Sequence, residues 1–318
     1  MMNKLGRTSK TLSDNFDEEL LLQEPISVWK RTYKRFISRR SGKVGLFLIG
    51  FVFLLALAAP IIAPYDPQEV LIGKELVKKR EAPCIHILGC ETSKPQHLMG
   101  IDGNYRDQFS RIIYGSRVSL SIGFSTVSFA VIGGVLLGAI AAFFSGWIDN
   151  VIMRMMDVIL GFPSLLLAIA IVAVLGPGIR NALLAIAIVT LPAYARLTRA
   201  SVLAVKELDF VKASVALGAS PFRILFFRIL PNALTPIVVL ATLGIATAIL
   251  DAAGLSFLGL GAQPPTPEWG TMLGSERNQV FSAPHLVFFP GIAIMITVLG
   301  FNLFGDGLRD ALDPRLND

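Results

Sequence analysis

Long uncharged stretches restrict what this chain can fold into more than any other feature. A helix needs about 20 consecutive apolar residues to cross the hydrocarbon core of a bilayer. Four stretches without a charged residue meet that requirement, and a further apolar run lies near the C-terminus: residues 44–64, 118–148, 158–179 and 229–250, and residues 286–305. We expect each of them to form a transmembrane helix.

A sixth span is expected at residues 181–195, if the run continues past Arg196 toward Arg199. Long arginine side chains can reach the membrane interface from within a helix. The composition agrees, because the 318 residues are 53% hydrophobic and 16% charged, whereas water-soluble domains carry about 25% charged residues. The predicted fold class is an all-α membrane protein with six transmembrane helices.

The net charge of +6, from 29 basic and 23 acidic residues, is distributed as a membrane topology requires and does not indicate a nucleic-acid partner. Basic residues in short loops mark the cytoplasmic side of a membrane protein. They crowd the entrance to the first span and recur in the loop between the fourth and fifth spans, at Lys30, Arg31, Lys34, Arg35, Arg39, Arg40 and Lys43, and at Arg196, Arg199, Lys206, Lys212, Arg223 and Arg228. Both clusters predict the same topology, with both termini in the cytoplasm.

Residues 1–43 are predicted to be a cytoplasmic segment that contains an amphipathic helix at about residues 25–40. In ISVWKRTYKRFISRR one helical face is basic and the other is apolar, with Ile26, Trp29, Tyr33, Phe36 and Ile37. Such a helix lies in the headgroup plane of a bilayer; a solvated linker helix is the alternative. The hydrophilic lead is too long, and the apolar run after it too extended, for a cleavable signal peptide.

Residues 65–112 are predicted to form a long extracytoplasmic loop that holds both cysteines of the chain, Cys84 and Cys90. A disulfide between them is favoured, because this compartment permits oxidation and no third cysteine competes. Free thiols are one alternative. A metal site that adds His86 and His97 is another, although its spacing matches no standard zinc pattern.

Two carboxylates fall within or beside the predicted spans, where ionisable groups are costly and often mark a transport pathway. Asp157 lies near Arg154 in the sequence, and we expect a structural role at the interface. Asp251 follows the uncharged run 229–250 and has no nearby basic residue. It is a candidate pathway residue, with an aspartate among the outer headgroups as the alternative.

Catalytic motifs are absent from the sequence. It contains no G-x-x-x-x-G-K-[ST] nucleotide loop, no H-E-x-x-H, no G-x-S-x-G and no C-x-x-C, and only three histidines. We therefore expect no catalytic residue, resident metal or cofactor in this chain. If the protein moves a solute uphill, another chain must supply the energy.

A polar segment at residues 207–231 interrupts the apolar runs on the predicted cytoplasmic side. Asp209 is expected to N-cap one short helix and Gly218 to end it in a left-handed conformation. Ser220 and Pro221 then supply an N-cap and a first-turn proline for a second helix. The pair forms either a projecting knob, with small residues that let another surface approach, or a connector that rests on the lipid.

The stretch DFVKASVALGASPFRILFFRILPNALTPIVV resembles the cytoplasmic coupling loop of binding-protein-dependent ABC importer permeases. Their pattern is E-A-A, three residues, Gly, nine residues, then I-x-L-P. The residues at its defined positions are Lys212, Ala213, Ser214, Gly218, Arg228, Leu230 and Pro231. The lysine, the serine and the arginine depart from the pattern, but KASVALGAS…RILPNAL is similar to the variant of dipeptide and oligopeptide permeases.

Other segments resemble the same branch of the family. MGIDGNYRDQFSRIIYGSRVSLSIG at 99–123 is similar to its LGTD-x-x-GRD-x-x-SR-x-x-YG-x-R-x-SL pattern, with Ile101 and Tyr105 as departures. AAGLSFLGLGAQPPTPEWGTML at 252–273 and FGDGLRDALDPRL at 304–316 also match. With the N-terminal region ending in APYDP, the resemblance covers nearly the whole chain and implies the "C" subunit of a peptide-type importer.

The resemblance implies a type I ABC importer permease fold in a bacterial or archaeal plasma (inner) membrane. It implies a second homologous permease, two ATPase subunits that hold ATP and magnesium, and an extracytoplasmic binding protein. The permease core would be residues 113–305, with five spans after the first at 44–64, and residues 306–318 would be a cytoplasmic tail. The residues expected to contact an ATPase are Asp209, Ala213, Ser214, Gly218, Ala219, Ser220 and Pro221.

Other cargoes and another class of transporter stay open at this point. The same machinery carries nickel or other metal complexes, glutathione or sugar-like solutes in related systems. An ion-coupled secondary transporter is the competing class. It commonly needs a relay of ionisable groups within the membrane, and this sequence offers only Asp157 and Asp251.

Overall fold

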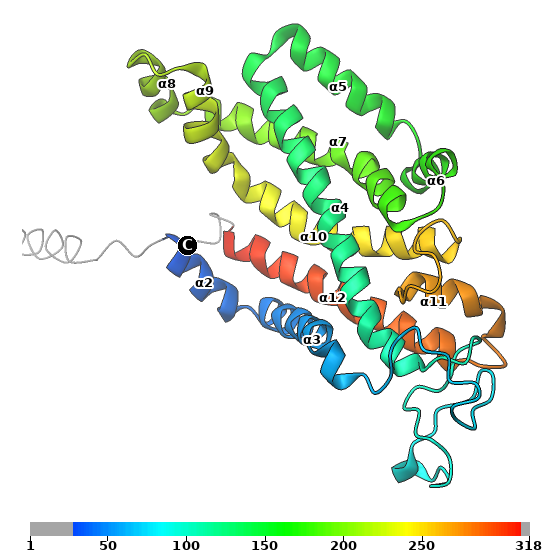
Figure 1. The fold of residues 1–318 in the computed structure, drawn as a ribbon. Coiled ribbons are helices and arrows are strands. Elements are labelled where there is room, and N and C mark those ends of the chain that lie inside the picture. The colour runs from blue at the N-terminus through cyan, green and yellow to red at the C-terminus, as the bar shows by residue number, and fades with distance from the viewer. Residues whose placement is uncertain (1–27, 313–318) are drawn as a thin grey trace, which may run out of the picture.

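The computed structural model describes residues 28–312, and this part of the chain is built from helices and loops without a β-strand (Figure 1). Its elements are α2 (Val28–Ser38), α3 (Arg40–Ile62), η1 (His86–Leu88), α4 (Gln108–Phe144), α5 (Gly146–Leu160), α6 (Ser164–Leu175), α7 (Ile179–Lys206), α8 (Asp209–Ala216), α9 (Pro221–Ile224), the π-helical turn η2 (Leu225–Ile229), α10 (Leu230–Phe257), α11 (Trp269–Glu276), η3 (Arg277–Gln279) and α12 (His285–Leu312).

Within residues 28–312, five helices are long and apolar enough to cross a membrane: α3, α4, α7, the continuous run Pro221–Phe257 that ends in α10, and α12. The pair α5 and α6, which bend by 91° at the break between them, gives a sixth crossing when it is counted as one broken span. The expected continuous helix at 158–179 is therefore wrong. Pro163 lies in the break, and a proline disfavours helical geometry in the residue before it and cannot donate a backbone hydrogen bond.

The second span begins ten residues earlier than the charge-free run, at Gln108. Asp107 N-caps it, since its carboxylate accepts a hydrogen bond of 2.7 Å from the backbone N–H of Ser110. The loop that is predicted to be extracytoplasmic thus ends at residue 107 in the structure, where 112 was expected. At the other terminus α12 continues to Leu312, so the first half of the expected tail is helical.

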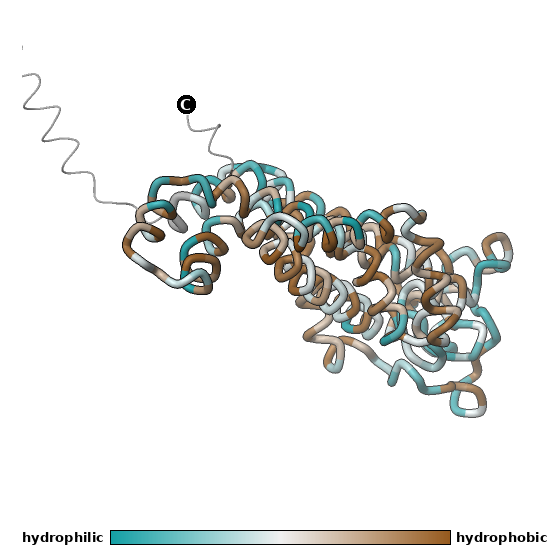
Figure 2. Tube along the Cα trace, turned by 90° about the horizontal axis from the view of Figure 1, so that it is seen from above, coloured by the Kyte–Doolittle hydropathy of each residue, from teal (hydrophilic) through white to brown (hydrophobic). Residues whose placement is uncertain are grey.

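The elements are arranged so that the predicted cytoplasmic and extracytoplasmic parts lie at opposite ends of the molecule. Figure 1 shows α2, α8 and α9 at the same end of the bundle as the C-terminus of α12, and the loop after α3 with α11 at the other end. In Figure 2 hydrophobic residues run along the long helices, whereas hydrophilic residues are frequent in the end segments. A membrane-spanning arrangement accounts for both observations.

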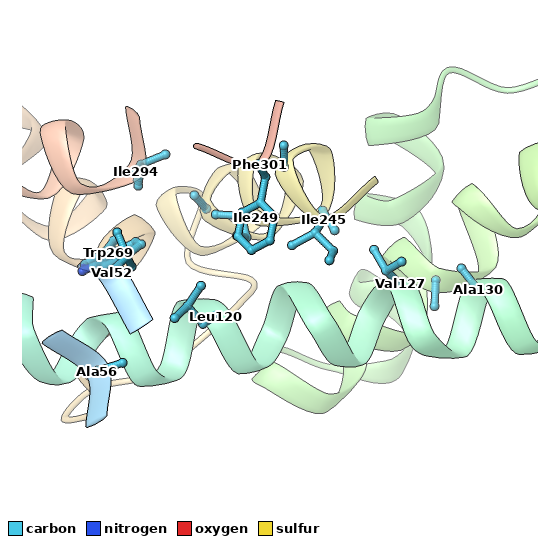
Figure 3. Close-up of a cluster of buried hydrophobic side chains, with 14 of the residues drawn as sticks. Val52, Ala56, Leu120, Val127, Ala130, Ile245, Ile249, Trp269, Ile294 and Phe301 are labelled. Carbon is cyan, nitrogen blue, oxygen red and sulfur yellow. The ribbon is translucent and has the colours of Figure 1, made fainter. Parts of the chain in front are cut away.

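Helix α4 lies at the centre of the bundle and packs against α3, α5, α7 and α10. Figure 3 shows Leu120 and Val127 of this helix in one apolar cluster with Ile245 and Ile249 of α10 and Phe301 of α12. The core of the bundle therefore joins spans that are far apart in the sequence.

Small residues allow the helix backbones to approach closely. A Cβ atom at Gly138 of α4 would meet the backbone of Ala195 in α7, and one at Gly45 of α3 would meet the backbone of Phe304 in α12. In lipid, helices associate through such packing because the solvent is as apolar as they are. The amphipathic helix α2 uses α12 as well: the Phe36 and Phe304 rings are 5.1 Å apart. Ile26 of its expected apolar face lies outside the described residues.

We predict that Gly45→Val lowers the melting temperature of the purified assembly that contains this chain. The added side chain forces α3 away from α12, and overpacking of this kind costs about 1–3 kcal/mol. Gly50→Val is the matched control on the same helix, because a Cβ atom there meets nothing within 4 Å. Equal melting temperatures for the two variants would contradict this packing.

Candidate functional site

The segment at residues 207–229, hereafter the knob, projects at the predicted cytoplasmic end and consists of α8, α9 and η2. Its break between the two helices is a Schellman motif. Gly218 has a φ of +77°, and its N–H donates to the Val215 carbonyl. The N–H of Ala219 donates to the Ser214 carbonyl at 3.1 Å. The left-handed end predicted at Gly218 is confirmed.

The start of α9 agrees with the sequence prediction, whereas the start of α8 differs from it. Ser220 caps α9, because its hydroxyl accepts from the backbone N–H of Arg223, and Pro221 occupies the first turn. The expected cap at Asp209 is wrong. Leu208, with extended backbone angles, occupies the N-cap position, and Asp209 lies in the first turn, where a carboxylate still interacts favourably with the helix dipole.

The knob is fastened to the spans through a buried apolar face. Val211, Ile224 and Ile229 pack in one cluster with Ala142 of α4 and Val202 of α7. All five side chains are 5% exposed or less. A force on the knob would therefore reach the ends of α4 and α7 without an intervening flexible segment.

The opposite side of the knob presents apolar side chains to the surroundings. Leu217 is 88% exposed, and Phe222 is 66% exposed. Ala213 is also exposed, so the helix offers a surface that another backbone can approach. Ser214 is half-buried, and its hydroxyl donates to the Phe210 carbonyl. Exposed apolar residues gathered on one element are typical of an interaction site.

A π-helical turn joins the knob to α10, and sequence reasoning missed it. The N–H of Leu230 donates to the Leu225 carbonyl, five residues back. The next residue, Pro231, has no N–H and would clash with the carbonyl four residues earlier in a regular helix. The Asn232 side chain donates to the Arg228 carbonyl at 2.7 Å. The only sequence signal for this turn was the proline of the motif.

The two candidate pathway carboxylates lie in different surroundings. Asp157 on α5 forms an ion pair with Arg196 of α7, not with Arg154, and both side chains are about half exposed. Asp251 on α10 is half-buried and forms no ion pair within residues 28–312. Thr247 lies one helical turn before it and is exposed. No ion pair or hydrogen bond joins Asp157 to Asp251 in the described structure.

The extracytoplasmic loop contains a disulfide between Cys84 and Cys90, whose Cα atoms are 5.4 Å apart. His97 is buried, with Nδ1 2.9 Å from Asp107 and Nε2 3.3 Å from Glu75. Neither thiol is left for a metal. Among the residues that the structure describes, no group of three or more histidine, cysteine, aspartate or glutamate side chains is placed to hold a metal ion.

Tyr65 lies beside His97 and Glu75, and its hydroxyl donates to the Glu75 carboxylate at 3.1 Å. Burial, followed by this hydrogen bond and the nearby negative charge of Glu75, raises the pKa of Tyr65 to about 12. The phenol therefore remains a hydrogen-bond donor across the physiological pH range.

Residues 99–111, the first part of the motif at 99–123, form buried polar contacts that hold the loop against the bundle. Asp102 accepts from the Arg106 backbone N–H at 2.9 Å and from its guanidinium at 2.8 Å. Arg111 donates to the Pro67 carbonyl at 2.8 Å. These residues are structural in this arrangement, and sequence reasoning did not assign them to a site.

Glu276, the last residue of α11, completes this attachment from a distant part of the chain. It accepts from Arg80 at 2.8 Å and from the backbone N–H of Gly103 at 3.0 Å. A side chain at Gly103 would meet this carboxylate, so the close approach requires glycine. No sequence signal connects positions more than 170 residues apart.

We predict that Glu276→Gln loosens the extracytoplasmic loop. It removes the ion pair with Arg80, and breaking a largely buried pair costs about 3–5 kcal/mol at most. Limited proteolysis from the extracytoplasmic side should cut the loop faster, and the melting temperature should fall. Glu91→Gln is the control, because its contact with Lys94 is long and exposed. Cleavage at the same rate in both variants would exclude this role for Glu276.

Two family models match the chain. Residues 134–318 match the model described as "Binding-protein-dependent transport system inner membrane component", and residues 27–79 match the "N-terminal TM domain of oligopeptide transport permease C". The first match includes the knob, α10 and α12, and the second includes α2 and α3.

Characterised relatives align over nearly the full length. The dipeptide transport system permease protein DppC of Alkalihalophilus pseudofirmus is 47% identical over 92% of this chain and 91% of its own. The di/tripeptide transport system permease protein DppC of Pseudomonas aeruginosa is 46% identical over 95% and 96%. The glutathione transport system permease protein GsiD of Pectobacterium atrosepticum is 42% identical over 91% of each.

Solved structures share the fold. A chain of the MetNI methionine ABC transporter in inward-facing conformations superposes with a TM-score of 0.53 and 18% identity, over 64% of this chain and 97% of its own. At this level of identity the match supports the fold alone. The expected type I ABC importer permease fold is confirmed by this likeness and by the family match.

Proposed function

Because the chain belongs to the family of binding-protein-dependent transport system inner membrane components, we propose that it is the transmembrane permease subunit of an ATP-driven importer of short peptides. The observation that carries this proposal is the anchored knob, whose buried face joins the ends of α4 and α7. Three relatives support short peptides as the cargo, since they are named for the transport of dipeptides, of di- and tripeptides and of glutathione.

The proposed assembly contains this chain, a second homologous permease, two ATP-binding subunits and an extracytoplasmic binding protein, in a bacterial inner membrane. ATP and magnesium belong to the ATP-binding subunits, so this chain is not itself an enzyme and carries no cofactor. The translocation path lies between the two permeases. The relatives reported above are bacterial, which favours a bacterial over an archaeal membrane.

The knob would act as a lever between ATP binding and the spans. An ATP-binding subunit contacts its exposed face, around Ala213 and Leu217. When the two ATP-binding subunits close, the knob moves with them, and its buried contacts carry the displacement into α4 and α7. Rigid-body movement of the spans then exposes the path alternately to each side, as in other alternating-access transporters.

The alternatives differ in cargo or in energy source. A glutathione importer has the same machinery and the support of one relative's name. A metal-complex importer has no such support among the relatives described. An ion-coupled transporter is less favoured, because Asp157 is engaged by Arg196 and so is not a free relay group. Uptake into vesicles that follows an ion gradient without ATP would favour that class.

We predict that Gly218→Pro uncouples ATP hydrolysis from peptide uptake while the complex still assembles. Proline holds φ near −65°, which is incompatible with the left-handed turn that orients α9. Gly218→Asn is the matched control, because asparagine tolerates this conformation and a Cβ atom meets nothing within 4 Å there. Uptake and ATPase rates would be measured in proteoliposomes. Unchanged coupling in the proline variant would refute the lever.

A bulky residue at Ala213 should also uncouple the two activities, because it would hold the partner surface away from α8. Ala213→Trp is the test, and Lys212→Ala is its neighbour control, since the contact of Lys212 with Glu207 is exposed. Wild-type uptake by the tryptophan variant would show that this face of the knob is not a docking surface.

Asp251→Asn should reduce uptake more than Asp157→Asn does. Asp251 on α10 forms no ion pair within residues 28–312, whereas Asp157 belongs to a half-exposed ion pair, which contributes about 0–1 kcal/mol. Initial uptake rates at matched protein levels decide between them. A larger loss for Asp157→Asn would remove Asp251 from the pathway.

A further inference from the structure

Helix α3 packs against α12 in two different ways along its length. In the half near α2 the contact is close, because Gly45 of α3 lies on the α12 backbone and Gly300 of α12 lies on Leu48 and Ile49 of α3. In the half toward the extracytoplasmic loop, the facing side chains are large, including Phe51 of α3. The helices therefore separate toward the extracytoplasmic end.

The separation leaves a cavity of about 260 Å³ between α3, α4, α11 and α12. Its walls are apolar and include Leu55, Met99, Phe109, Trp269, Phe289 and Ile296. Figure 3 shows Val52, which also lines it, close to Trp269 in the adjoining core. An engineered apolar cavity of about 150 Å³ stays dry and takes up small hydrocarbons, so this one has room for a longer hydrocarbon segment.

The polar atoms in the wall are already engaged. The Trp269 indole N–H donates to the Ile112 carbonyl at 3.0 Å, and the Ser116 hydroxyl donates to the Ile113 carbonyl. No charged residue lines the cavity. It offers nothing that would hold water or the termini of a peptide, because both need hydrogen-bonding partners.

The position of the cavity indicates where its occupant comes from. Phe51 and Ile62 line it and are also 46% and 41% exposed. They lie next to the outward face of α3, where Leu54, Leu57 and Ile61 are 66%, 72% and 88% exposed. A face as apolar as this on a membrane-spanning helix contacts lipid. The cavity is thus continuous with the hydrocarbon of the outer leaflet.

We propose that this cavity is a binding site for one acyl chain of an outer-leaflet phospholipid, which enters at the flank of α3 and fills the space between α3 and the rest of the bundle. The acyl chain fills the space between the helices, whereas at the other end of α3 glycines let α3 and α12 touch directly. The site follows from the packing of α3 and does not depend on which cargo the assembly carries.

Photolabelling of the complete assembly tests this site. The assembly is reconstituted with a phospholipid that carries a diazirine at the middle of one acyl chain, illuminated and digested, and labelled residues are located by mass spectrometry. We expect label on Leu54 and Leu57, which report surface lipid, and also on Met99, Phe109 and Trp269 inside the cavity. Label on the outward face alone would overturn the proposal and would indicate that a second permease or a closed wall excludes lipid.

Filling the cavity provides the matched comparison. Ala293 of α12 lines it, and Ala293→Phe should reduce cavity labelling several-fold without changing the label on Leu54 and Leu57. Ala293→Leu, a smaller change, serves if the phenylalanine variant does not assemble. Ile61→Phe adds the same group on the outward face of α3, where residue 61 is 88% exposed, and should leave cavity labelling unchanged. Undiminished cavity labelling in an assembled Ala293 variant would also overturn the proposal.

Discussion

The contact between α4 and α7 is the interaction on which the rest of the structure depends. Gly134 and Gly138 of α4 let the two backbones touch, because they lie directly against the backbone of Leu191 and Ala195 in α7. In a bilayer this close packing, not exclusion from water, holds helices together. The same two helices end at the buried cluster that anchors the knob. Packing within the membrane and the anchor of the knob therefore form one continuous packed unit.

The other spans are held to this unit in different ways. Ion pairs hold α5 against α7. In one of them the Arg199 guanidinium donates two hydrogen bonds, each of 2.6 Å, to the Asp149 carboxylate. The extracytoplasmic loop is tied to the bundle by buried carboxylates such as Asp102 and Glu276. Helix α3 makes its close, glycine-mediated contacts with α12 at one end. The core is thus tightly packed, whereas its periphery relies on polar contacts or lipid.

The sequence was sufficient to predict five of the spans and the turn within the knob. Apolar length determines which segments cross, and the φ preference of Gly218 and the capping hydroxyl of Ser220 act locally. Prediction failed where a distant contact or a single backbone detail decides the outcome. The break at Pro163 looked like part of an apolar run, and Leu208 took the cap position expected for Asp209. Glu276 could not be connected to Arg80 and Gly103 without the fold.

In the proposed assembly an ATP-binding subunit holds the knob, which therefore does not rest on lipid. A photoreactive amino acid in place of Leu217, which is 88% exposed, tests this most directly in the assembled transporter. The account predicts a cross-link from this position to an ATP-binding subunit, and none from the same group in place of the exposed Tyr33 of α2. Cross-links from position 217 to lipid alone would contradict it.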